Sequence, residues 1–295
     1  MPGLRCGTGQ GCGSLTATFL GFLAILLWSA FAVLTVVSGT MPPFQLTAVT
    51  FAVGGTAGLV LLALRGEIGV LRQNWRVWAL GTGGLFCYHT LYFGALRSAP
   101  PAEAGLVNYL WPLLIVLFSA LLPGERLTGR HVAGALVGFV GLAVLFLAGD
   151  RAGGAHGLFP GYGLALGAAF VWSGYSVLSR RFRHVPSGVV AGFCVATSVL
   201  AGVAHLAFET TVWPDAALQW GALALIGLGP VGFAFFLWDQ GVKHGDIRLL
   251  GVLSYAAPVL STAWLVLAGR AQAGWPLALA CAMIVCGGMI AAGRR

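Results

Sequence analysis

The sequence predicts an all-α membrane protein with ten transmembrane helices, arranged as two inverted repeats of five helices. Three observations predict this fold: the apolar composition, ten long apolar segments, and a match between the two halves of the chain. Of 295 residues, 58% are hydrophobic and 8% are charged, and the mean hydropathy is +0.90. Soluble domains carry about 25% charged residues, so this composition indicates a chain embedded in a lipid bilayer.

Ten segments are long and apolar enough to be considered as spans, since a helix needs about 20 apolar residues to cross the hydrocarbon core. The first five are expected at 15–37, 44–64, 77–97, 102–122 and 131–148. The second five are expected at 159–180, 188–208, 218–242, 248–268 and 274–292. The predicted domains are a cytoplasmic tail at 1–14, a first repeat at 15–148, a linker at 149–158, a second, inverted repeat at 159–292 and a cytoplasmic C-terminus at 293–295.

The positions of arginine and lysine predict the orientation, because cytoplasmic loops carry an excess of both. With the N-terminus inside, the cytoplasmic segments hold Arg5, Arg65, Arg72, Arg76, Arg126, Arg130, Arg180, Arg181, Arg183, Lys243, Arg248, Arg294 and Arg295. The opposite side holds Arg97, Arg151 and Arg270. Both termini are therefore expected in the cytoplasm. The basic residues lie in short loops and form no stripe on a folded face, so the net charge of +8 indicates no nucleic-acid partner.

The two halves of the chain resemble each other. WSAFAVL, starting at Trp28, matches WSGYSVL, starting at Trp172. At a constant separation, Tyr92, Arg97, Gly105, Tyr109 and Pro112 align with Trp238, Lys243, Gly251, Tyr255 and Pro258. Short matches between two Leu/Ala/Gly-rich helices also arise by chance, but shared Trp-Ser, Tyr and Pro in the same order favour a duplication. Because each repeat has an odd number of helices, the second copy must be inverted, which is typical of transporters with a substrate site between the repeats.

Other classes of site find little support in the sequence. Cys87, Cys194, Cys281 and Cys286 fall in apolar segments and no CxxC pair occurs, so neither a zinc nor a redox site is expected. The glycines of residues 7–13 have no preceding strand and are interpreted as part of a flexible tail rather than a phosphate-binding loop. The chain has no HExxH or GxSxG motif and no paired intramembrane aspartates, so no enzyme, metal or cofactor is predicted.

The organisation resembles that of the drug/metabolite transporter superfamily, and in particular its ten-helix bacterial exporter branch. The resemblance rests on the five-plus-five repeat, Trp-Ser in the first and sixth segments, and PLL followed by GERLTG after the fourth. It covers roughly residues 15–292. YHTLYFGAL and NYLWP are most similar to the bacterial aromatic amino acid exporters, which implies a multi-pass protein of the bacterial inner membrane. Gly269-Arg270 stands where many members repeat Gly-Glu, so a symmetric role for Glu125 is in doubt.

Three segments gather polar-tipped aromatic residues on one face when their residues are placed on a helix. Lipid offers a tyrosine hydroxyl or an asparagine amide no hydrogen-bond partner, so these faces are expected to turn inward. The candidate substrate-binding residues are Tyr88, His89, Tyr92, Asn108, Tyr109, Trp111, Trp172 and Tyr175. The alternative is that they only pack between helices. His89 is a neutral hydrogen-bonding group, a partner of a substrate carboxylate, or a protonatable switch.

The charged residues narrow the class of cargo. Asp239 is the one acidic residue well inside a predicted segment, and Lys243 lies four residues later, where it is expected to pair with Asp239. No arginine lies near the centre of a segment, which argues against phosphorylated substrates. Tyr, Trp, His and Asn suit a neutral or zwitterionic molecule with an aromatic body. We therefore predict an exporter of amino acids, aromatic ones favoured, that works by alternating access; the alternative is an exporter of drugs, purines or other neutral metabolites.

Glycine pairs such as Gly54…Gly58, Gly134…Gly138 and Gly163…Gly167 permit close approach of helices. Packing within one bundle explains them without a second chain, so a monomer is expected. The predicted partners are the lipid bilayer and a small-molecule substrate.

Overall fold

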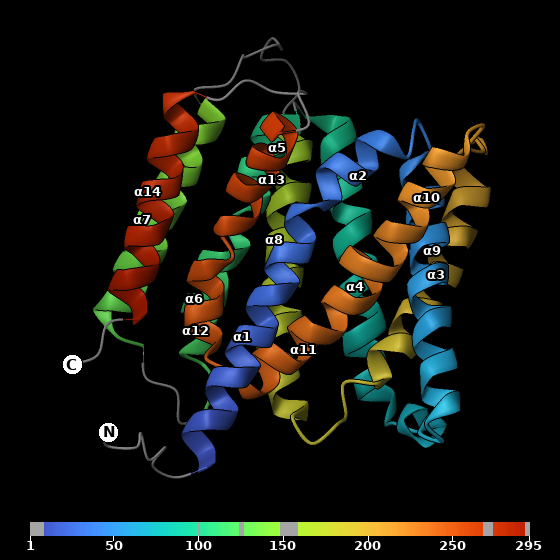
Figure 1. Ribbon diagram of the computed structural model, residues 1–295, viewed down its shortest axis with the longest axis horizontal. Helices are drawn as coiled ribbons and strands as arrows, with labels where there is room; N and C mark the ends of the chain where they lie inside the picture. The colour runs from blue at the N-terminus through green and yellow to red at the C-terminus, as the bar shows by residue number, and fades with distance from the viewer. Residues whose placement is uncertain (1–8, 100, 124–126, 148–158, 268–273, 293–295) are drawn as a thin grey trace, which may run out of the picture.

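The computed structural model describes residues 9–99, 101–123, 127–147, 159–267 and 274–292, and within these ranges it is helical without strands (Figure 1). Glu125, Arg151 and Arg270 lie outside the described residues. Successive segments run in alternating directions between the two ends of a single bundle. The start of α1 and the end of α14 lie at the same end (Figure 1).

The helices of the first half are α1 (Gly9–Ser29), α2 (Phe31–Val37), α3 (Pro43–Leu64), α4 (Trp75–Ser98), α5 (Pro101–Asn108), α6 (Trp111–Ser119) and α7 (Gly129–Leu147), with a 3-10 turn η1 (Ile68–Leu71). Those of the second half are α8 (Phe159–Ser179), η2 (Arg180–Phe182), α9 (Val189–Phe208), α10 (Ala217–Ile226), the π-helical η3 (Gly227–Phe233), α11 (Ala234–His244), α12 (Ile247–Leu253), α13 (Ala256–Leu267) and α14 (Trp275–Ala292). Each of the ten predicted segments contains one or more of these helices over its described residues. In the described part of the chain, four stretches have the length and composition to cross a membrane: Gly13–Val37, Pro43–Leu64, Val189–Phe208 and Ala217–His244.

The predicted segments at 102–122 and 248–268 are each interrupted in the middle. The first break separates α5 from α6 at Tyr109, and the second separates α12 from α13 at Tyr255. A proline follows three residues after each tyrosine, at Pro112 and Pro258. Proline has no amide hydrogen and removes a helical hydrogen bond, so each break lies where its proline weakens the helix. The two breaks therefore occupy equivalent positions in the two halves.

The segments at 15–37 and 218–242 are also irregular. The first is interrupted between α1 and α2 at Ala30, and the second contains the π-helical η3 around Pro230. The indole Nε1 of Trp28 donates a hydrogen bond of 2.9 Å to the carbonyl of Pro230. This bond joins the first half of the chain to the wide turn in the second half.

Glycines let α3 lie directly against η3. A Cβ atom built on Gly54 would lie 2.5 Å from the carbonyl oxygen of Gly227 and 2.8 Å from the Cα of Gly232. These are backbone atoms, so they cannot move aside as the tip of a side chain does. The close approach holds the irregular part of the second half against a helix of the first.

Replacing Gly54 by valine is therefore expected to lower the melting temperature of the detergent-purified protein. Overpacking typically costs about 1–3 kcal/mol, and here backbone must shift. The matched control is Gly163→Val on α8, where an added Cβ meets no described atom within 4 Å. Equal melting temperatures for Gly54→Val and the wild-type protein would contradict this packing.

Candidate functional site

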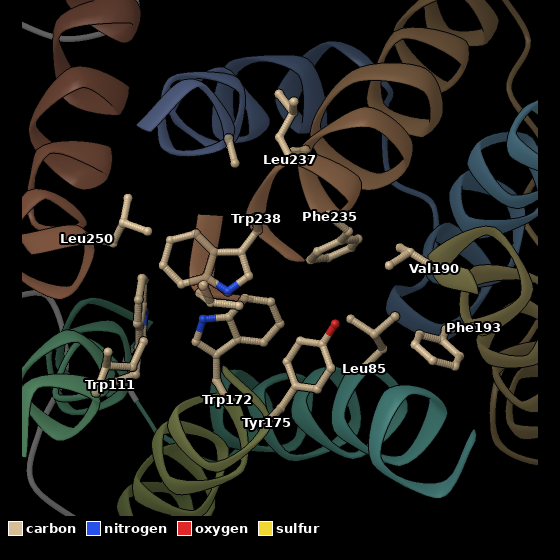
Figure 2. Close-up of a cluster of buried hydrophobic side chains, with 14 of the residues drawn as sticks. Leu85, Trp111, Trp172, Tyr175, Val190, Phe193, Phe235, Leu237, Trp238 and Leu250 are labelled. Carbon is tan, nitrogen blue, oxygen red and sulfur yellow. The ribbon is translucent and has the colours of Figure 1, made fainter. Parts of the chain in front are cut away.

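Tryptophan side chains from both halves meet in the middle of the bundle. The ring of Trp172 on α8 lies 5.5 Å from that of Trp28 on α1, 6.3 Å from Trp111 on α6 and 6.2 Å from Trp238 on α11, between centroids. Figure 2 shows Trp111, Trp172 and Trp238 pointing toward one another, with Phe235 beside them. Aromatic pairs at these distances stabilise a packed centre, so the rings form a fixed layer across the bundle.

A cavity of about 260 Å³ lies against this aromatic layer. Its lining residues are Trp28, Phe31, Tyr88, His89, Tyr92, Phe93, Asn108, Tyr109, Trp111, Trp172, Pro230, Val231, Phe235, Ala257 and Ser261. The structure thus brings together seven of the eight predicted site residues: Tyr88, His89, Tyr92, Asn108, Tyr109, Trp111 and Trp172. Both halves contribute walls, and none of the lining residues that the structure describes is Asp, Glu, Lys or Arg.

The side chains of Tyr88 and Asn108 connect two walls of the cavity. The Nδ2 atom of Asn108 donates a hydrogen bond of 3.2 Å to the hydroxyl of Tyr88. The ring of Tyr88 stacks on that of Tyr92, with centroids 5.9 Å apart, and lies 5.2 Å from that of Trp172. The Oδ1 atom of Asn108 is buried and has no hydrogen-bond partner among the described residues. It is therefore available as an acceptor for a bound molecule.

His89 is fixed by a bond to its own helix. Its Nδ1 atom lies 2.7 Å from the carbonyl oxygen of Leu85, which can only accept, so Nδ1 carries the proton. Its ring lies edge-on to Phe51, with centroids 5.0 Å apart. The second nitrogen, Nε2, is left for the cavity, where in the neutral ring it is an acceptor.

Tyr175 does not line the aromatic cavity. It lies nearly one turn further along α8 than Trp172, and the two rings pack 5.4 Å apart. Figure 2 shows Tyr175 between Trp172 and Leu85. It borders instead a void of about 10 Å³ that is also lined by Asp239 and Lys243. The shared helical face predicted for Trp172 and Tyr175 exists, but the ring of Trp172 separates Tyr175 from the cavity.

Several lining residues were not among the predicted ones. Trp28 could have been identified from the sequence, because it is the repeat partner of Trp172 and lies in the middle of its segment. Phe235 and Pro230 could not, since a phenylalanine in an apolar segment is ordinarily packed in the core or against lipid. Only the wide turn of η3 places both on the cavity.

A buried ion pair lies on the other side of the aromatic layer. The Nζ atom of Lys243 lies 2.7 Å from Oδ2 of Asp239, and both side chains are almost fully buried. Lys243 also donates to the carbonyl of Val185 at 3.0 Å, and Ser187 donates to Asp239. The predicted pairing of Asp239 with Lys243 is confirmed. The pair ties α11 to the loop that follows η2.

Comparison with known proteins agrees with this architecture. The EamA-like transporter family matches residues 15–147 and, separately, residues 159–292. Over 280 residues the chain is 58% identical to the aromatic amino acid exporter YddG of Ancylobacter novellus, covering 94% of this chain and 96% of that protein. It is 28% identical to the aromatic amino acid exporter YddG of Salmonella typhimurium, covering 85% and 87%.

More distant relatives and a solved structure extend the comparison. The pseudopaline exporter CntI of Pseudomonas aeruginosa is 27% identical, covering 82% of this chain and 84% of that protein. A crystal structure that is 57% identical superposes with a TM-score of 0.91, covering 94% of this chain and 96% of the other. The chain belongs to the EamA-like transporter family, which confirms the resemblance to the drug/metabolite transporters.

Proposed function

We propose that this protein exports aromatic amino acids across the bacterial inner membrane. The observation that carries the proposal is a cavity between the two halves with aromatic walls and a few polar groups, and with no charged side chain among the described residues that line it. The names of the relatives from Ancylobacter novellus and Salmonella typhimurium support the same substrate class.

The cavity suits a small zwitterion with a ring. Its volume of about 260 Å³ lies just below the usual range of about 300–1,000 Å³ for ligand sites, which favours a small molecule. The stacked rings of Tyr88 and Tyr92, with Trp172, offer apolar faces for an aromatic side chain. The free Oδ1 of Asn108 provides an acceptor for the α-ammonium group. Phosphorylated substrates would find no cationic partner among the described residues that line this cavity.

The proposed architecture is ten membrane crossings in two inverted repeats, the first at 15–148 and the second at 159–292. It is supported by the separate family match to each half and by the equivalent breaks at Tyr109 and Tyr255. We propose that both termini lie in the cytoplasm. This is supported by the start of α1, which lies at the end of the bundle where α3 and α8 end and are followed by Arg65 and Arg180 (Figure 1). We call this end the basic end.

We infer from this arrangement a state closed toward the cytoplasm. Tyr88, Tyr92 and Phe31 lie in the parts of α4 and α2 remote from the basic end, whereas Trp238 and the Asp239–Lys243 pair lie between the cavity and the basic end. Export requires a second state in which these contacts separate, so that the cavity is reached from the cytoplasm. Alternating access between two such states is typical of inverted-repeat transporters.

Expression of the protein in a bacterium is expected to raise tolerance of a toxic aromatic analogue such as p-fluorophenylalanine and to lower its cellular content. A matched culture expressing Asn108→Leu, which removes the proposed acceptor while keeping similar size, is expected to lose most of this tolerance. If the wild-type protein raises tolerance of purine analogues and does not raise tolerance of p-fluorophenylalanine, the alternative of a neutral-metabolite exporter is correct instead.

Flux is expected to run downhill without an imposed proton gradient. The described residues that line the cavity include no carboxylate, and Asp239 is bound by Lys243 and Ser187. Proteoliposomes loaded with labelled phenylalanine should therefore release it at equal pH on both sides. Vesicles that release no labelled phenylalanine until a pH gradient is applied would contradict this prediction.

A further inference from the structure

Tyr175, Asp239 and Lys243 lie together outside the aromatic cavity, at a void on the other side of the aromatic layer. The void has a volume of about 10 Å³, enough for no more than a water molecule. Residues of α4, α8, α9 and α11 line it, so both halves of the chain form its walls. Among the described residues that line it, Asp239 and Lys243 are the charged ones. An amino acid therefore fits here only after these helices have moved apart.

The buried ion pair is not what a stable fold alone would require. Lys243 and Asp239 are 3% and 2% exposed, and their charged atoms lie 2.7 Å apart. Replacing such a pair by apolar residues of similar volume is often neutral or stabilising, because two charges no longer have to be removed from water. Ionisable side chains inside a membrane ordinarily mark the path of a substrate or an ion. A ligand that carries both charges explains the pair better than packing does.

The hydroxyl of Tyr175 provides a second, independent observation at the same void. Tyr175 is 3% exposed, and its hydroxyl oxygen is buried with no hydrogen-bond partner among the described residues. Figure 2 shows this hydroxyl pointing away from Trp172. A buried polar group without a partner loses the hydrogen bonds that water would give it, so such groups are rare and call for an explanation. The hydroxyl is available to a ligand that reaches the void.

The void lies next to a contact between α8 and α11 in the aromatic layer. The Nε1 atom of Trp238 donates a hydrogen bond of 3.1 Å to Oγ of Ser176, which joins the two helices. Tyr175 and Asp239 are the sequence neighbours of these two residues. Separation of α8 from α11 at this point breaks the bond and enlarges the void. A molecule that moves from the cytoplasm to the cavity then passes Tyr175, Asp239 and Lys243.

We propose that Tyr175, Asp239 and Lys243 form an entry site for the amino acid zwitterion, occupied when the protein opens toward the cytoplasm. The inference rests on the proposed export of aromatic amino acids. The α-ammonium group of the substrate takes the place of Lys243 beside Asp239. The α-carboxylate takes the place of Asp239 beside Lys243 and accepts a hydrogen bond from the hydroxyl of Tyr175.

This exchange selects for molecules with both charges. Asp239 and Lys243 each replace one partner by another, so neither charge is left unpaired while the substrate passes. A molecule with only an ammonium group would leave Lys243 without a partner, and one with only a carboxylate would leave Asp239 without one. Leaving a buried charge unpaired is costly, so both kinds of molecule are expected to enter poorly.

Tyr175→Phe tests the hydroxyl while keeping the ring. Uptake of labelled phenylalanine is measured in inside-out membrane vesicles, because their outer surface is the cytoplasmic face; vesicles without the protein give the background. KM is expected to rise about two- to tenfold, the effect of one lost hydrogen bond. The melting temperature should stay equal or rise, since the substitution removes a buried group that has no described partner.

Tyr255→Phe is the matched control. The hydroxyl of Tyr255 is also buried without a partner among the described residues. Its ring packs against that of Phe139, with centroids 6.3 Å apart, and it does not line the void. KM should therefore not change in this variant.

The charges are tested with Asp239→Leu combined with Lys243→Met. This double variant is expected to keep most of the stability, while KM rises at least about tenfold. Unlabelled tyrosine is compared as a competitor with phenethylamine, which lacks the carboxylate, and 3-phenylpropionate, which lacks the ammonium group. Tyrosine should compete best in the wild-type protein, and its advantage over both analogues should fall at least about fivefold in the double variant. A purely structural role of the pair would leave that advantage unchanged.

Wild-type KM in both Tyr175→Phe and the double variant would overturn the entry site and leave the proposed function intact. An unchanged advantage of tyrosine in the double variant would also overturn it, because the pair would then only hold the helices together. An equal rise of KM in Tyr175→Phe and Tyr255→Phe would contradict the role of the Tyr175 hydroxyl. If vesicles with the wild-type protein take up no more phenylalanine than the background, the proposed function and the entry site are both wrong.

Discussion

Alanine at Tyr88 is expected to lower the efflux of phenylalanine about two- to tenfold while the protein is still made and inserted normally. The substitution removes the ring that stacks on Tyr92 and contacts Trp172, and with it the hydroxyl that accepts from Asn108. Trp111→Ala is expected to act in the same direction, because Trp111 forms another wall of the cavity. Initial rates of labelled efflux from proteoliposomes, normalised to inserted protein, provide the measurement.

Two controls separate substrate binding from general damage. Tyr88→Phe keeps the ring and loses only the hydroxyl, so it should retain more activity than Tyr88→Ala. Trp220→Ala removes an aromatic residue that is 46% exposed and lies away from the cavity, and it should leave efflux unchanged. Unchanged flux in both Tyr88→Ala and Trp111→Ala would contradict the assignment of the cavity as the substrate site.

Replacing Asp239 by alanine is expected to give the largest loss of stability of any substitution considered. Asp239 is 2% exposed and lies 2.7 Å from Lys243, which is 3% exposed. Removing one partner of a buried pair leaves an uncompensated charge and costs about 3–5 kcal/mol. The melting temperature in detergent should fall by about 6–20 °C.

A double variant distinguishes loss of the pair from loss of the residue. Asp239→Leu combined with Lys243→Met removes both charges and fills the space with apolar groups, so it should recover most of the stability. Asp215→Ala, at an exposed aspartate, should change nothing. If Asp239→Ala melts like the wild-type protein, the ion pair contributes no stability to the fold.

The positions of Tyr88, Tyr92 and Asn108 could be predicted because polar groups in apolar segments must turn away from lipid. That rule gives the face of a helix but not what lies in front of it, which is why Tyr175 was expected on the cavity and lies behind Trp172. Phe235 could not be predicted, since its position depends on the π-helical turn around Pro230. The hydrogen bond from Trp28 to Pro230 likewise could not be predicted from the residues around either partner, because the two lie far apart in the sequence.

The number and order of the segments followed from hydropathy, and the repeat followed from matched residues. The breaks at Tyr109 and Tyr255 were missed, although Pro112 and Pro258 stand at both places. Hydropathy averages over a whole segment and does not respond to the loss of one backbone hydrogen bond. Prolines within an apolar segment therefore predict interruptions of the helix that hydropathy alone does not predict.

The most direct test of the central claim is a substrate panel in proteoliposomes that contain only this protein. Labelled phenylalanine, tyrosine and tryptophan are compared with leucine, glutamate, lysine and adenine, with empty liposomes as background. We expect flux of the three aromatic amino acids at least about tenfold above that of glutamate and lysine. Aromatic amino acids that move no faster than in empty liposomes, while another compound crosses readily, would contradict it.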